Sequence, residues 1–200
     1  MEQLSPQHAL VLVSAPASLP VSVAEAKAQM RVEHSDDDTL IERLINAAVT
    51  FVDATGVLGK AMITQSWGQW LKPNPGKIRL LIGPIQSVDA VKYYNHSNVI
   101  TTDTLSNYDV LGTPSHTVIS PKSGYSWPTT YIRSDAIKIE YTVGFGDASS
   151  DVPEPVRHAL VMLVAHWYEN RENELIGTIS KNLPFGFDEL IGSERAQWYG

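Results

Sequence analysis

Two histidines on one expected helix are the first residues in this chain whose type suggests metal chemistry. His158 and His166 stand eight residues apart, so a helix separates them by about 12 Å along its axis. One metal ion cannot bridge that distance. His166 could share a ligand with Glu169 or Asn170, but a catalytic zinc needs three protein ligands. We therefore interpret both histidines as packed or hydrogen-bonded residues at a helix interface.

Two acidic or glycine-containing motifs also have simpler explanations than catalysis. The run 36–38 holds three aspartates, which could bind a hard cation but also suit the positive end of a helix dipole. The run 144–147, Gly-Phe-Gly-Asp, lacks the Lys-Ser/Thr of a phosphate loop. We interpret the first run as a helix start and the second as a turn. A small metal-dependent enzyme remains an alternative, but we expect no catalytic activity, no cofactor and no bound metal.

The composition narrows the class of protein further. The chain has 200 residues, 43% of them hydrophobic and 18% charged, with no cysteine and a net charge of −7. These values are typical of a globular protein and exclude thiolate zinc sites and cysteine nucleophiles. Only 15 basic residues are present, which argues against nucleic-acid binding through phosphate contacts as the main activity. No run approaches the roughly 20 apolar residues of a membrane span, so we expect a soluble protein, cytosolic when made.

Helices are expected near both ends of the chain, over about 22–32, 36–55 and 155–171. Ser22 and Glu25 fit the capping box of the first. The second has one continuous apolar stripe at helical spacing, formed by Leu40, Ile41, Leu44, Ile45, Ala48, Phe51 and Val52. The third is apolar on more than one face. A neighbouring subunit could cover the second face, so we predict subunit packing through Val161, Met162 and Trp167.

Between these helices, over about 60–145, the apolar period changes to two, which is typical of strands. The run 137–143 gives the clearest alternation. Prolines and glycines in the segment 112–133 predict a long irregular loop with one short strand at 117–119. The fold class we expect is α+β, a helical bundle formed by the N- and C-terminal helices with a β-rich insertion between them.

The two ends of the chain are expected to lie outside that domain. Residues 1–20 hold three prolines and predict an exposed extended arm. The tail 175–200 has apolar residues at helical spacing and finishes with Trp198 and Tyr199. A tryptophan so near the end is either disordered or an anchor in a partner, and aromatic anchors dominate interface energetics. We favour the anchor, and expect removal of residues 183–200 to leave the domain folded.

The order of these caps, turns and core patterns resembles phage head–tail connector (adaptor) proteins, which occur in long-tailed phages, prophages and gene transfer agents. No single motif is decisive. The resemblance covers about residues 18–192 and rests on the runs 20–27, 30–33, 36–38, 40–41, 47–48, 55–56, 65–67, 83–88, 91–94, 108–110, 127–128, 141–146, 152–153 and 165–172. It identifies residues 21–174 as an adaptor domain and 175–200 as a docking tail.

The resemblance implies a structural virion protein at the head–tail junction, present in the cytoplasm of the producing bacterium before assembly. Its partners would be further copies of itself in a ring, usually of twelve, the portal protein, and the next tail-side connector or stopper. DNA would pass through the ring without sequence-specific binding. A tail-completion or stopper protein of the same particle is the alternative. Portal docking would fall to Phe185, Phe187, Leu190, Ile191, Trp198 and Tyr199.

Overall fold

The computed structural model describes residues 10–170 and 186–195. The chain divides into two compact units. A β unit comprises residues 1–17 and 64–144, and a helical unit comprises residues 18–63 and 145–200. The chain therefore passes from one unit to the other three times along its length.

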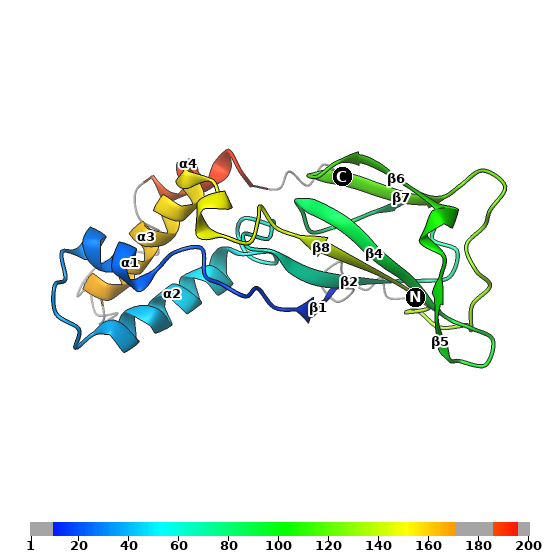
Figure 1. Ribbon diagram of the computed structural model, residues 1–200, viewed down its shortest axis with the longest axis horizontal. Helices are drawn as coiled ribbons and strands as arrows, with labels where there is room; N and C mark the ends of the chain where they lie inside the picture. The colour runs from blue at the N-terminus through cyan, green and yellow to red at the C-terminus, as the bar shows by residue number, and fades with distance from the viewer. Residues whose placement is uncertain (1–9, 171–185, 196–200) are drawn as a thin grey trace, which may run out of the picture. The chain divides into compact units, whose positions relative to one another are not determined.

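The helical unit packs four α-helices around one apolar core (Figure 1). They are α1 (Val23–Met30), α2 (Asp38–Val52), α3 (Glu154–Glu169) and α4 (Phe187–Gly192), with a 3-10 turn η3 (Ser149–Asp151) before α3. α1 begins with the full capping box of Ser22 and Glu25, which satisfies two backbone donors at once. α2 turns one face inward, burying Ile41, Ile45, Ala48 and Val52.

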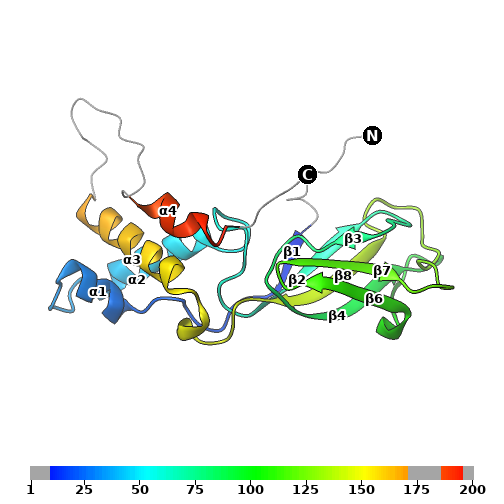
Figure 2. The same cartoon turned by 90° about the horizontal axis from the view of Figure 1, so that it is seen from above.

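The β unit contains a five-stranded sheet, of which β1, β2, β8 and β4 are labelled in Figure 2. Its order is β1 (Leu10–Ser14), β2 (Gln65–Leu71), β8 (Ile137–Val143), β4 (Ile85–Tyr94) and β5 (Ile100–Asp103), and every neighbouring pair is antiparallel. The central strand β8 alternates strictly between buried and half-buried residues. This is the two-residue period of a strand with one face against a core.

A second, three-stranded sheet has the order β3 (Ile78–Arg79), β7 (His116–Pro121) and β6 (Tyr108–Thr113), with a 3-10 turn η2 (Leu105–Asn107) before β6. Gln69 of β2 joins the two sheets. Its Nε2 donates to the carbonyl of Arg79 at 3.1 Å, and its Oε1 accepts from the amide of Leu81 at 3.1 Å. The buried glutamine thereby satisfies its polar atoms inside the unit, as buried amides must.

The expected fold class is wrong. Within residues 10–170 and 186–195, eight strands in two sheets accompany only four short α-helices, so the chain is mostly β-sheet and not a helical bundle with a β-rich insertion. The segment 112–133 contributed to the error, because residues 113–116 close a hairpin between β6 and β7. Gly112 permits this turn with a φ of 112°, where an added Cβ would lie 2.0 Å from the carbonyl oxygen of His116.

Candidate functional site

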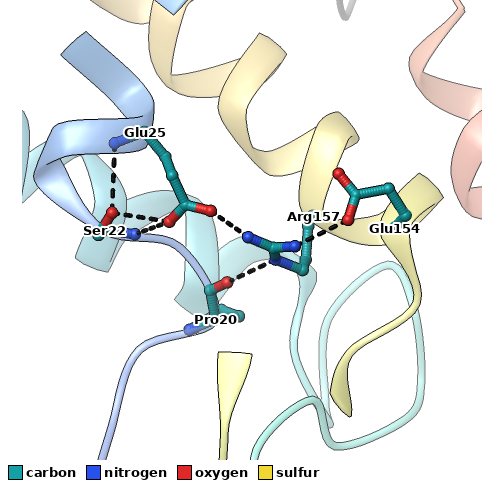
Figure 3. A network of polar contacts seen from close by, with 5 residues as sticks. All are labelled: Pro20, Ser22, Glu25, Glu154 and Arg157. Atoms are coloured by element: carbon teal, nitrogen blue, oxygen red, sulfur yellow. Dashed lines mark hydrogen bonds and ion pairs between the residues drawn. The ribbon is translucent and has the colours of Figure 1, made fainter. Parts of the chain in front are cut away.

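Arg157 is the centre of a polar network that ties α3 to the start of α1 (Figure 3). Its guanidinium donates to the carboxylate of Glu25, to Glu154 Oε2 at 2.7 Å and to the carbonyl of Pro20 at 3.3 Å. Ser22 completes the network, because its amide and hydroxyl donate to Glu25 Oε2 at 2.8 and 2.7 Å. One arginine thus holds three carboxylate or carbonyl acceptors from two segments more than a hundred residues apart in sequence.

The electrostatics of this network are those of a structural clamp. The hydrogen bonds from Ser22, and then the charge of Arg157, hold the pKa of Glu25 below its ordinary value. A shallow hollow of about 340 Å³ beside the network is lined further by Gln29 and His158. Every charge that Figure 3 draws in the network has a partner of opposite charge. The arrangement therefore fixes α1 and α3 to each other.

The aspartates at 36–38 also act between helices. Lys27 of α1 donates to Asp38 Oδ1 at 2.6 Å, and the Tyr168 hydroxyl of α3 donates to Asp37. Asp37 is the residue before α2 but makes no side-chain cap bond to it. The sequence predicts that the three aspartates start a helix. Two of them also connect the start of α2 to α1 and α3.

The two histidines of α3 have separate surroundings. His158 is exposed and His166 half-buried on α3, and the Asn170 amide donates to the His166 carbonyl at 2.8 Å while lying 3.3 Å from its Nδ1. Across residues 10–170 and 186–195, no three histidine, aspartate or glutamate side chains are placed to hold a metal ion together. The same residues contain no helix long and apolar enough to cross a membrane.

The residues assigned to portal docking divide into two groups. Phe187 and Ile191 of α4 are fully buried in the core of the helical unit, and Leu190 packs against that core. Their apolar face therefore covers the chain's own interior. Phe185, Trp198 and Tyr199 lie outside the described residues, and docking stays a prediction for the whole set. Removing residues 183–200 would uncover the core, which contradicts the expectation that the rest stays intact.

The three residues assigned to subunit packing lie on α3 and are only partly buried. Val161 and Trp167 pack against the edge of the helical core, and Met162 is half-buried. The Trp167 ring meets the ring of Phe51 edge-to-face at 6.3 Å, and Phe51 itself is exposed. An apolar surface thus remains on the helical unit of a single copy. Its contact with another subunit stays a prediction.

Sequence reasoning missed the exposed apolar residues of the β unit. In β1, Val11, Leu12 and Val13 are 44%, 44% and 48% exposed, although consecutive strand residues point to opposite faces. Further exposed apolar residues lie next to or within β5 and β6, namely Val99, Ile100, Val110 and Leu111. The available signal was the uncharged run 9–14, which is too apolar for a strand that is meant to face water on both sides.

The large sheet carries a cluster of paired charges around Glu140. Glu140 of β8 lies between Lys92 and Lys138, at 2.6 and 2.8 Å. Burial alone would raise the pKa of Glu140, but the hydrogen bonds from the two lysines lower it overall. Gly68 makes room for the Lys138 side chain, which an added Cβ would approach at 2.3 Å, and Lys138 lies over the Trp70 ring at 5.4 Å. This pairing stabilises the sheet and offsets part of the positive charge of the two lysines.

Paired charges and exposed apolar surfaces are typical of proteins that assemble with others. The head completion protein family matches residues 21–180, and the chain belongs to this family. It is therefore a structural protein of the virion with a head–tail connector role, and it is not an enzyme. The resemblance found in the sequence is confirmed at the level of the family. No curated protein matches the chain.

Three solved structures share the fold over nearly the whole chain. A chain in "Neck of empty GTA particle computed with C6 symmetry" has 23% identity and a TM-score of 0.76, covering 96% of this chain and 97% of that one. A chain in "Virion of native gene transfer agent (GTA) particle" has 21% identity and a TM-score of 0.75, with the same coverage. A third, in "Neck of native GTA particle computed with C12 symmetry", has 21% identity and a TM-score of 0.68, covering 94% and 98%.

Proposed function

We propose that this chain assembles into a ring in the neck of a phage-like particle, where it joins the portal to the tail and surrounds the DNA channel. The observation that carries the proposal is the shared fold with chains from gene transfer agent necks, over 96% of this chain in the first of them. Two of those neck structures were computed with C6 and C12 symmetry. Six- or twelvefold symmetry supports a ring, and the resemblance favours twelve copies.

The charge of the chain suits a protein that surrounds DNA without holding it. The net charge of −7 multiplies when many copies close into a ring, and an acidic channel repels phosphates. Tight binding to the phosphate backbone of DNA needs several lysines or arginines, each of which displaces a counterion. In the β unit, Lys92 and Lys138 instead both pair with Glu140, which offsets one of their two positive charges. DNA can then pass through the ring without being held there.

The chain reaches the portal, in this proposal, through the tail 175–200. Because Phe187 and Ile191 are buried in the helical unit, they position the tail, and the direct contacts fall to Phe185, Trp198 and Tyr199. Aromatic side chains supply large contact area at low entropy cost. On the opposite side the ring meets the next connector or stopper of the tail.

The test is negative-stain imaging of the purified chain mixed with its portal protein. We expect rings that cap the portal. The matched control is a chain without residues 196–200, which keeps Phe187 and Ile191 and so keeps the core, but lacks both terminal aromatic residues. It should fold and bind the portal more weakly. If the full chain does not bind the portal and binds purified tails instead, the chain is a stopper or tail-completion protein and not the portal-binding adaptor proposed here.

A further inference from the structure

Among the residues that the structure describes, both edges of the five-stranded sheet lack a second partner strand, and exposed apolar side chains lie at each. β1 and β5 end the strand order, so each pairs on one side only. Three consecutive residues of β1 are exposed, as are Val99 and Ile100 at the start of β5. Natural edge strands are usually protected by lysine, proline or a covering segment, because their free amides and carbonyls recruit other strands. The strand residues of neither edge include a lysine, an arginine or a proline.

We propose that β1 of one copy pairs with β5 of the next, so that the sheets of neighbouring copies join around the ring. This inference rests on the ring proposed above and names the surfaces that close it. A ring needs head-to-tail contacts, in which each copy offers two different surfaces that face apart. The two ends of one sheet meet that requirement. The small sheet does not, because its β3 end is only two residues long.

The strand directions determine how the two edges meet. All four neighbouring pairs in the sheet are antiparallel, so by pairing alone the first and fifth strands have the same sense, although the twist of a sheet turns each strand from the next by about 20–25°. Adjacent copies in a twelvefold or sixfold ring are turned by only about 30° or 60°, which cannot reverse a strand. A ladder that keeps this sense between copies is parallel. An antiparallel β1–β1 contact would instead require a twofold axis and would stop at a dimer.

The charges of the two edges favour a second copy as the partner. An acidic chain repels its own copies, so contacts between them form best where the surface is neutral. β1 carries no charged residue, and β5 carries only Asp103, whose carboxylate already accepts hydrogen bonds from Tyr108 at 2.6 Å and Tyr125 at 2.9 Å. A ladder of four or five residues is short, so it forms in the particle, where copies are held close.

Cysteine pairs test this contact directly, because the chain has no cysteine of its own. We would assemble particles with Leu12→Cys/Thr102→Cys or Val11→Cys/Thr102→Cys, treat them with a short thiol-reactive cross-linker and separate the products by size. Adjacent strand residues point to opposite faces, so one of the two pairs has its thiols on the same face. The matched control is Leu111→Cys/Thr102→Cys, since Leu111 is 57% exposed on the edge of the other sheet.

We expect a series of cross-linked multimers of increasing size from one of the two β1–β5 cysteine pairs, and no multimers from the control pair or from the single substitutions. A dimer formed by Leu12→Cys alone would replace the proposal with a twofold contact. Cross-linking to a different protein would assign the edge to that partner. If imaging shows intact rings but no cross-linked multimers form, the proposed strand pairing is wrong while the proposed function stands. If the particles contain no ring of this chain, the proposed function itself fails.

Discussion

Replacing Phe187 with alanine tests whether α4 belongs to the core of the helical unit. α4 has only six residues, and a helix so short is not stable by itself in water. Its folding therefore depends on docking through Phe187 and Ile191, both 0% exposed. Lys60–Glu194 at 3.4 Å and Arg195 Nε to the Val57 carbonyl at 2.8 Å add polar contacts around it, but ion pairs near the surface contribute little.

The magnitude follows from the burial of the ring. A phenylalanine buries about 150–250 Å², which corresponds to about 4–6 kcal/mol at about 25 cal/mol per Å². Alanine keeps part of that area but leaves a cavity, so we expect Phe187→Ala to cost about 3–5 kcal/mol. If α4 undocks before the rest of the unit unfolds, the global loss is capped at the docking free energy. The remainder then appears as faster amide exchange in α4.

Urea unfolding and hydrogen exchange of the isolated chain measure both quantities. Leu190→Ala is the matched control on the same helix, and because Leu190 is only half-buried we expect less than half the loss. The reasoning would be refuted if Phe187→Ala changed the free energy of unfolding by less than about 0.5 kcal/mol and left α4 exchange unaltered. If the same variant then failed to join particles, Phe187 would contact a partner and not the core.

Four further outcomes are expected. Arg157→Ala should lower the free energy of unfolding by about 1–2 kcal/mol at neutral pH. That loss should shrink in acid. The pKa of Glu25 is lowered in the folded chain, so its ion pair stabilises the fold fully above the ordinary pKa of 4.5, and this stabilisation is lost as the pH falls through the lowered pKa. Urea titrations at several pH values measure the change in the free energy of unfolding. Alkaline unfolding, followed by circular dichroism, should begin above about pH 10. Burial raises the pKa of Tyr108 and Tyr141 above the ordinary 10.0, so the folded chain holds their protons more tightly than the unfolded chain does, and this stabilisation declines as the pH rises from 10 toward the raised pKa values. Deleting residues 196–200 should change Tm by less than about 2 °C in a thermal scan; a larger fall would place those residues in the fold. Sedimentation of the free chain at micromolar concentration should show monomers, because the charge of −7 opposes association, and stable closed rings would contradict this.

Local patterns in the sequence predicted local structure well. The stripe through Ile41 and Ile45 predicts a helix over 36–55, and α2 runs Asp38–Val52. Ser22 and Glu25 predict a capping box, which α1 contains in full. The alternation over 137–143 predicts the strand that became β8. Each of these signals depends on residues within about two helical turns or one strand of each other, so the sequence carries it directly.

What the sequence could not supply was pairing between distant segments. β1 pairs with β2, more than fifty residues later, and its short apolar run alone does not identify a partner. The β6–β7 hairpin was hidden by Pro114 and Pro121, one in the tight turn and one at the strand end. With these strands unrecognised, the helices received too much weight and the fold class was wrong.

The candidate site shows the same division. Amphipathic spacing in 187–191 correctly indicates an apolar helix face, but it does not say which surface that face will cover. Covering the chain's own core and docking on another protein require the same pattern. Arg157 was not singled out at all, because its partner Glu25 lies 132 positions away and only the folded chain brings the two charges together.

The order in which the ribosome makes the two units has a consequence for folding. α2 is complete at Val52, but α3, which covers its apolar face, begins only at Glu154. At synthesis rates of about 5–20 residues per second, that face waits roughly 5–20 s for its partner. The strands that the structure describes in the β unit, in contrast, have all been made by Val143. Until α3 has been made, the nascent chain therefore carries its described strands together with an amphipathic helix whose apolar face is still uncovered.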